Sequence, residues 1–190
     1  AHRLARDHRS RVLTLTVLDI SPTLKMYEAT DKAFATAYYH WFFLIQKPPL
    51  PEQLLAGHVP HYVLKRLGRG KGGMKHFAPA AVREYVRAFR DPRTIHGTCE
   101  DYRASATIDL EHDRKDLRRK IRMPVLVLWG RQGVIQRLFE PLKDWREVAT
   151  DVRGKALPSG HFLAEEAPEA TLAALDAALA KYSTLKEGKN

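Results

Sequence analysis

A histidine and an aspartate far apart in the sequence have the residue types of a general base and the acid that orients it. His161 lies in L-P-S-G-H-F-L, residues 157–163, and Asp19 ends the apolar run V-L-T-L-T-V-L-D. An Asp that is hydrogen-bonded to one imidazole nitrogen leaves the other nitrogen able to accept a proton. Each residue alone has an ordinary interpretation, because histidines are common in surface loops and aspartates often end strands. Their shared position after predicted strands favours a catalytic pair.

Three segments are predicted to be strands of a parallel sheet. Residues 12–20 and 124–130 are apolar, with no clean alternation, as is typical of strands covered on both faces. A short third strand is expected at residues 155–157. In open α/β sheets, sites form beyond the carboxyl ends of the strands. The sheet is therefore expected to bring Asp19 and His161 together.

Helical patterns fill most of the remaining chain. Residues 1–7, 139–150 and 169–182 are expected to flank the sheet, because parallel strands need crossovers that are usually helical. The segments between the first two strands also have helical patterns: the aromatic segment 31–46, the amphipathic segment 79–90 and the segment 91–107, which starts with Asp-Pro. The glycine-rich residues 68–74 are expected to form a flexible connection.

This order of elements predicts an α/β fold class and a division of the chain into domains. Strand, large helical insert, strand, helix, strand, helix is the order of the C-terminal part of an α/β fold that carries an all-helical cap. The core is expected at residues 1–20 and 122–185, and the cap at residues 21–121. The front part of such a fold is expected to lie upstream of residue 1.

The composition narrows the class of protein. The 190 residues, 44% of them hydrophobic, are enough for one domain with an inserted subdomain. The sequence has neither an apolar run of about 18 residues nor a secretory signal, so no membrane contact is expected. The single cysteine, Cys99, fits a reducing cytoplasm.

The charge is strongly basic, with a formal net charge of +10 and a pI of about 9.8. Lys and Arg are scattered among acidic residues, and even the densest stretch, residues 114–120, is interrupted by Asp116. This mixture favours a solvated basic surface over a nucleic-acid site, and no nucleic-acid partner is expected. A weaker interpretation is that the positive field attracts a small anionic substrate.

Other candidate nucleophiles and ligands are less convincing. Cys99 is expected to be a buried packing residue, and Ser159 is too near His161 in sequence to face it. His58 and His61 stand three residues apart, but no cysteine or carboxylate completes a set of metal ligands. No metal and no cofactor are expected.

Five stretches together resemble fluoroacetate dehalogenases, which are haloacetate dehalogenases of the α/β-hydrolase superfamily. The resemblance covers nearly all of the chain, and the His-Trp pair and the D-Y-R-A motif are its most specific parts. The stretches are V-L-D-I-S-P-T, Y-Y-H-W-F-F-L, E-D-Y-R-A-S-A-T-I-D-L-E-H-D, P-V-L-V-L-W-G and S-G-H-F-L-A-E-E-A-P-E.

The resemblance implies a two-step reaction. An Asp carboxylate of the family displaces halide from the substrate carbon, and a His-activated water hydrolyses the resulting ester to release glycolate. Asp19 matches the orienting acid and His161 the base, whereas His40, Trp41 and Tyr102 match the residues that bind the leaving halide. By periodicity alone, these three residues of the predicted cap read as aromatic and helix-packing residues.

The resemblance also implies what lies outside these residues. The nucleophilic Asp and two arginines that hold the substrate carboxylate match positions upstream of residue 1, so this chain alone is expected to be inactive. Many α/β-hydrolases carry their acid after the later strand, where W-G-R-Q-G places Gly133. The resemblance assigns that acid to Asp19. It also suggests a homodimer that acts on a small halogenated carboxylate.

Two alternatives remain open at the level of sequence. An epoxide hydrolase uses cap tyrosines to protonate the epoxide oxygen, and Tyr102 could be one of them. The His40-Trp41 pair argues for halide instead. The third hypothesis is a non-catalytic basic interaction module derived from a hydrolase, and the missing nucleophile is its only support.

Overall fold

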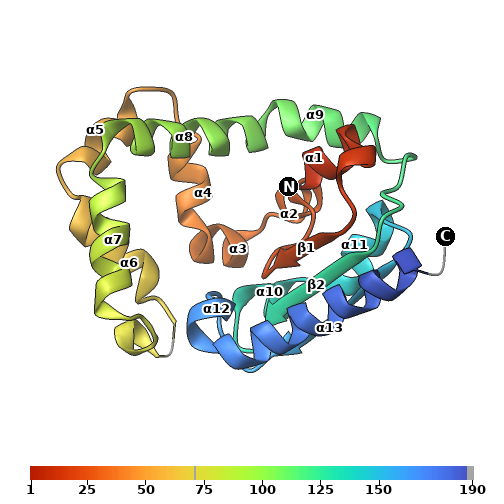
Figure 1. Cartoon of the computed structure of the whole chain (residues 1–190). Helices are drawn as coiled ribbons and strands as arrows, with labels where there is room; N and C mark the ends of the chain where they lie inside the picture. Colours follow the sequence, from red (N-terminus) through yellow and green to blue (C-terminus); the bar gives the residue numbers. More distant parts are fainter. Residues whose placement is uncertain (71, 188–190) are drawn as a thin grey trace. The chain divides into compact units, whose positions relative to one another are not determined.

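The computed structural model describes residues 1–70 and 72–187, with side chains described up to residue 180. It divides into two compact units (Figure 1). Ala1–Ser21 and Lys120–Asn190 form the first, called here the sheet unit. Pro22–Arg119 form the second, called the helical unit. No helix among the described residues is both long and apolar enough to cross a membrane.

The sheet unit contains three parallel strands in the order β1-β2-β3. They are β1 (Leu15–Leu18), β2 (Val125–Gly130) and β3 (Val152–Leu157). Leu15 lies opposite Val125, which lies opposite Val152. The helices of the unit are α1 (His2–Asp7), the 3-10 turn η1 (Arg9–Arg11), α10 (Val134–Leu138), α11 (Pro141–Val148), α12 (Leu163–Glu166) and α13 (Pro168–Glu187).

Helices cover the sheet on both faces, but unequally. One face packs Leu15 and Val17 of β1, with residues of β2 and β3, against Ala5 of α1 and Trp145 of α11. The other face packs β2 and β3 against α12 and α13, which lies along the sheet in Figure 1. The apolar cluster on this second face contains no residue of β1. The apolar cluster on the first face thus includes all three strands, and that on the second face includes β2 and β3.

The interpretation of residues 12–20 as a strand covered on both faces is wrong for β1. Its four residues alternate, with Leu15 and Val17 buried and Thr16 and Leu18 exposed. Successive side chains of a strand point to opposite faces, and among the described residues the apolar cluster of α12 and α13 includes residues of β2 and β3 and none of β1. The third strand is longer than expected, because it begins at Val152 rather than near residue 155.

The helical unit is built from short helices. They are α2 (Thr23–Glu28), α3 (Lys32–Ala37), α4 (Tyr39–Leu44), α5 (Leu50–Ala56), α6 (Val59–Leu67), η2 (Gly73–His76), α7 (Pro79–Phe89), α8 (Pro92–Ala106) and α9 (Ile108–Lys115). Their core comprises Leu44, Leu55, Val59, Val63, Ile95 and Cys99.

Local sequence explains several helix ends. α7 and α8 begin with proline, whose missing N–H costs nothing in the first turn. Asp91 caps α8 by accepting a hydrogen bond from the backbone N–H of Arg93 at 2.9 Å. In the glycine-rich run, Lys71 lies outside the described residues, and η2 begins at Gly73, whose φ of 55° suits glycine.

The aromatic segment predicted as one helix is two. Asp31 caps α3 by accepting from the N–H of Phe34 at 2.7 Å, and the chain leaves helical geometry at Tyr38, with φ −112° and ψ 31°. Tyr38 is buried and stacks on Phe34, with ring centroids 4.9 Å apart. The helix α4 then begins at Tyr39 and contains His40 and Trp41.

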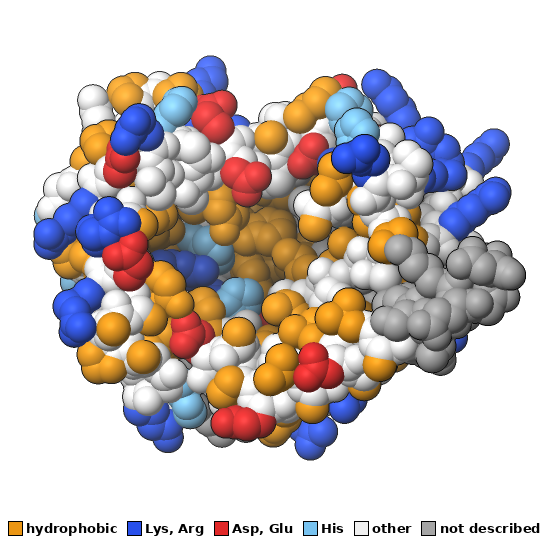
Figure 2. All heavy atoms as spheres, viewed as in Figure 1, with side chains coloured by type: hydrophobic (Ala, Val, Ile, Leu, Met, Phe, Trp, Pro, Cys, Tyr) orange, Lys and Arg blue, Asp and Glu red, His pale blue; other side chains and the backbone are white. Residues whose placement is uncertain are grey.

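Basic side chains are spread over the viewed face. Figure 2 shows Lys and Arg interspersed with Asp and Glu. The viewed face therefore carries charges of both signs, as the sequence of residues 114–120 also does.

Candidate active site and the cavity of the helical unit

Asp19 directly follows β1 and is held in an unusual backbone conformation. Its φ is +50°, in the left-handed region, and it is the one non-glycine residue with positive φ in the described chain. Such conformations cost free energy and concentrate at functional sites. The carboxylate is 1% exposed, and its Oδ1 accepts a hydrogen bond from the backbone N–H of Gly130 at 2.9 Å. The ends of β1 and β2 thus fix the carboxylate in place.

The other oxygen of Asp19 meets His161. Oδ2 lies 2.6 Å from Nδ1 of the imidazole, so the two residues form a short charge-assisted hydrogen bond. An ionised carboxylate only accepts, so Nδ1 carries the proton that is donated. Nε2 of neutral His161 then has the lone pair of a general base, and the side chain is 31% exposed. The parallel sheet brings together the two residues that the sequence singles out.

Two glycines make room for this pair. A methyl group at Gly130 would lie 1.8 Å from the carbonyl oxygen of Gly160, so the loops after β2 and β3 can approach only because residue 130 has no side chain. A methyl group at Gly133 would lie 3.3 Å from Oδ1 of Asp19. Residue 133, where many α/β-hydrolases carry their acid, therefore lies beside the carboxylate of Asp19.

Glu166 of α12 holds the loop that carries His161. Its Oε2 accepts from the N–H of Gly160 at 2.7 Å, and its Oε1 accepts from the N–H of Phe162 at 3.0 Å. One carboxylate thus binds the backbone on both sides of the histidine. Sequence reasoning missed this residue, although an acid shortly after a loop histidine and at the end of a short helix is a detectable signal. Glu166 is a positioning residue for His161.

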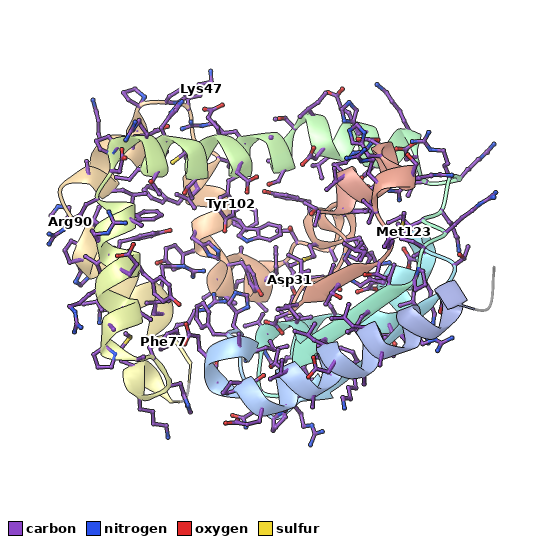
Figure 3. The ribbon with its side chains drawn as sticks, viewed as in Figure 1. Asp31, Lys47, Phe77, Arg90, Tyr102 and Met123 are labelled. Atoms are coloured by element: carbon purple, nitrogen blue, oxygen red, sulfur yellow. The ribbon has the colours of Figure 1, made fainter. Side chains whose placement is uncertain are left out.

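The helical unit has a cavity of about 230 Å³ that contains two of the three predicted halide ligands. His40 of α4 is buried, and its ring centroid lies 5.8 Å from that of Tyr102 of α8. Tyr102 leaves α8 on the side of α4 (Figure 3). Burial raises the pKa of Tyr102, so its hydroxyl stays protonated at neutral pH. The polar lining residues are His40, Tyr62, Arg66, Tyr85, Thr98 and Tyr102.

Trp41 lies next to this cavity and is not among its lining residues. It is 6% exposed and packs edge-to-face against Phe34 and Tyr38, and its ring centroid lies 6.2 Å from that of Tyr102. Packing thus accounts for most of its surface. Among the described residues its indole N–H has no hydrogen-bond partner, so the donor remains available for a ligand.

Arg66 of α6 is a cavity residue that sequence reasoning missed. Its Nη2 lies 2.9 Å from Nε2 of His40. Burial lowers the pKa of Arg66 from its usual value, and its guanidinium nevertheless remains charged at neutral pH. No signal in the sequence links Arg66 to a histidine 26 residues away, because the two side chains meet only in the folded helical unit.

The remaining candidates have structural explanations. Cys99 is fully buried in the core of the helical unit, and burial raises the pKa of its thiol. The hydroxyl of Ser159 donates to the carbonyl oxygen of Gly160 at 3.3 Å. A further cavity of about 260 Å³ lies between β2, β3 and α13, and none of the predicted site residues lines it.

One acidic cluster was not expected. Ligand atoms of Glu52, His96 and Glu100 lie within 4.8 Å of one another, a spacing that metal ions use. Arg103 already binds both carboxylates, however, with its Nη1 2.7 Å from Glu52 and 2.6 Å from Glu100. The arrangement is that of an ion-pair network between α5 and α8.

Comparisons with known proteins agree with the resemblance seen in the sequence. No protein-family model matches the chain. A fluoroacetate dehalogenase from Burkholderia sp. is 42% identical over 171 residues, which are 90% of this chain and 56% of that protein. The chain thus spans little more than half the length of this curated relative.

Solved structures give the same fold. A putative alpha/beta hydrolase from Nostoc sp. PCC 7120 is 56% identical with a TM-score of 0.88, and the match covers 92% of this chain and 60% of that one. A putative epoxide hydrolase from Pseudomonas aeruginosa is 37% identical with a TM-score of 0.87, over 96% of this chain and 62% of that one.

Proposed function

Because this chain is a homologue of fluoroacetate dehalogenase and has the fold of an α/β-hydrolase, we propose that it carries the base, the orienting acid and the cap of a haloacetate dehalogenase. The substrate is a small halogenated carboxylate such as fluoroacetate, and the products are the hydroxy acid and halide. The observation that carries the proposal is the 2.6 Å hydrogen bond between Asp19 and His161 at the ends of the strands.

The first step needs a nucleophile and no base. The relatives are longer than this chain, and we propose that the nucleophilic Asp belongs to the portion of such relatives that this chain does not span. Its carboxylate oxygen forms a bond to the halogen-bearing carbon, and the carbon–halogen bond breaks with its electron pair on the halide. Donors in the cap stabilise the charge that develops on the halide.

The second step uses His161. Water attacks the ester carbonyl while Nε2 takes its proton, and collapse of the tetrahedral intermediate returns the Asp carboxylate and releases the hydroxy acid. Asp19 keeps the proton of the imidazole on Nδ1 and stabilises the imidazolium that forms. Neither step requires a metal or a cofactor.

The halide ligands are His40, Trp41 and Tyr102. Fluoride is a poor leaving group, so strong N–H and O–H donors at the departing atom lower the barrier. The contacts that support this role are the shared cavity of His40 and Tyr102 and the ring contact of Trp41 with Tyr102.

Epoxide hydrolysis is the second candidate, and Tyr102 favours it. Its hydroxyl faces a cavity, and burial keeps it protonated, as the acid that protonates an epoxide oxygen must be. The similar structure from Pseudomonas aeruginosa is described as a putative epoxide hydrolase. The buried His40 beside Tyr102 favours halide. Its imidazole adds a nitrogen ligand to the phenol of Tyr102, and protonation of an epoxide oxygen requires only the phenol.

A chimera tests the proposal. The portion of the Burkholderia relative that this chain does not span is joined to the chain, and fluoride release from fluoroacetate is measured with an ion-selective electrode. We expect turnover. The same chimera with His161→Ala should stop after alkylation, so mass spectrometry should find the ester trapped on the supplied Asp.

Three results would count against parts of this proposal. Epoxide opening without fluoride release by the folded chimera would favour the second candidate. Full turnover by the His161→Ala chimera would exclude His161 as the base. Binding and turnover of neither substrate by a folded chimera would argue against both enzymatic proposals.

A further inference from the structure

The cavity of the helical unit contains a positive charge that no carboxylate neutralises. Arg66 is partly buried, and the described residues provide no ion-pair partner for its guanidinium. The groups that interact electrostatically with it include Arg69, Tyr62, Tyr102 and Tyr39. A buried charge is costly unless an opposite charge or hydrogen bonds compensate it.

The charge of Arg103 in the same unit is compensated in the usual way, by carboxylates of neighbouring residues. It is also partly buried, and it binds Glu52 and Glu100 at 2.7 Å and 2.6 Å. Arg66 instead faces a cavity whose lining includes no Asp or Glu among the described residues. The missing counter-charge is therefore best supplied by a ligand.

The hydrogen bond to His40 has a consequence for its protonation. Arginine has donors and no acceptor, so Nε2 of His40, 2.9 Å from Nη2, must accept. An imidazole that accepts at Nε2 is neutral and carries its proton on Nδ1. Arg66 thereby determines which nitrogen of His40 can donate.

Two phenols of the cavity are also donors. Burial raises the pKa of Tyr62 to about 12 and raises that of Tyr102, so both phenols keep their protons at neutral pH. The Thr98 hydroxyl is already committed to the carbonyl of Thr94 at 2.8 Å. One cation and two protonated phenols around 230 Å³ form a surrounding that suits a small anion.

We propose that Arg66 makes this cavity an anion site, supplying its charge and holding His40 in the Nδ1–H tautomer. The proposal rests on the proposed function in that the anion of that reaction is halide. Arg66 is a positioning residue toward His40 and a binding residue toward the anion. Its contribution does not depend on any step of catalysis.

Chloride binding to the whole 190-residue chain tests this proposal. The chain is labelled with ¹⁵N, the imidazole signals of His40 are assigned by their loss in His40→Gln, and chloride is titrated against gluconate at constant ionic strength. We expect a pyrrole-type Nδ1, a pyridine-type Nε2 and a saturable shift of both. Arg66→Met should weaken chloride binding by about tenfold to a hundredfold, the range for a hydrogen bond to a charged group.

Three variants serve as controls. Arg66→Lys keeps the charge and a donor, so its affinity should stay within about tenfold of the parent. Arg83→Met removes one charge from the exposed face of α7 and should change nothing. Arg66→Gln provides a second neutral variant if Arg66→Met loses the near-UV circular dichroism of the folded chain.

Two results would overturn the proposal. One is equal chloride affinity in the parent and in a folded neutral variant at position 66. The other is a parent chain in which the proton of His40 resides on Nε2. Neither readout involves turnover, so an inactive chimera would count against the proposed function and leave this result standing.

Discussion

The sheet unit and the helical unit hold their candidate residues in different ways. Asp19 and His161 are fixed through the backbone: the N–H of Gly130 binds Asp19, and Glu166 binds the N–H groups on both sides of His161. His40 and Tyr102 are fixed by ring packing and by one contact with Arg66. The first arrangement depends on strand ends, and the second on side chains of neighbouring helices.

This difference separates two kinds of sensitivity. A site held by backbone hydrogen bonds fails when a glycine gains a side chain or when one carboxylate loses its charge. A site held by packed rings tolerates a substitution that keeps the packed volume and fails when a donor is lost. Substitutions in the two units are therefore expected to differ in the size and nature of their effects.

Asp19→Asn in the chimera should lower the rate of ester hydrolysis by about 10⁴-fold, the loss seen when such an acid becomes an amide. The amide oxygen would keep the bond to the N–H of Gly130, so its NH₂ would face His161. The proton of the imidazole would then move to Nε2, and no lone pair would face the water. Single-turnover fluoride release and mass spectrometry of the ester separate the two steps.

The matched control is Asp151→Asn, because this exposed carboxylate of the sheet unit pairs with Arg153. It should keep full turnover. Normal ester hydrolysis by Asp19→Asn would show that the backbone-held pair does not set the tautomer of His161.

Gly130→Ala should destabilise the chain by about 3 kcal/mol, the upper range for overpacking. The added methyl would lie 1.8 Å from the carbonyl oxygen of Gly160 and would separate the loops after β2 and β3. Gly97→Ala is the control, because no atom lies within 4 Å of its methyl in α8 and alanine favours helices. Urea unfolding of both variants measures the difference, and equal midpoints would contradict the close approach of the two loops.

Trp41→Phe in the chimera should reduce defluorination about tenfold and dechlorination less, because a hydrogen bond to the leaving atom is worth about 1.4 kcal/mol. Phe keeps the ring contacts with Phe34 and Tyr38 and removes the indole N–H. Trp129→Phe is the control, since its indole donates to Gln136 in the sheet unit. Equal losses on fluoroacetate and chloroacetate would assign Trp41 to packing alone.

Glu52→Gln should cost about 1 kcal/mol at neutral pH, as for a partly exposed ion pair. The hydrogen bond from Arg103 lowers the pKa of Glu52 from 4.5 to about 2. A depressed carboxyl pKa stabilises the fold above the unfolded value and loses that contribution as pH falls through the folded value.

The gap in unfolding free energy between the parent and Glu52→Gln should therefore be constant above about pH 4.5 and close toward pH 2. Urea unfolding at a series of pH values measures it. A gap independent of pH would mean that Arg103 does not depress this pKa.

Sequence patterns were sufficient to predict local features of the structure and the site at the carboxyl ends of the parallel strands. The predicted strand ends bring Asp19 and His161 to one edge of the sheet, because parallel strands align their carboxyl ends, and the structure pairs the two residues. Asp91-Pro92 predicted the start of α8, because Asp is favoured as a helix N-cap and Pro as the first helical residue. The comparisons confirm the resemblance and the fold class, and the roles of the individual site residues stay predictions.

Tertiary structure decided what depends on neighbours distant in sequence. The helix predicted at residues 31–46 breaks at Tyr38, where the stacked rings of Phe34 and Tyr38 accompany the non-helical residue. Among the described residues, the Thr16 and Leu18 face of β1 is exposed, although the sequence predicts a strand covered on both faces. Arg66 forms a hydrogen bond with His40, 26 residues away in the sequence, and no sequence motif predicts this contact. Periodicity records how a segment orders its own backbone, whereas contacts between segments depend on packing, which no single stretch of sequence contains.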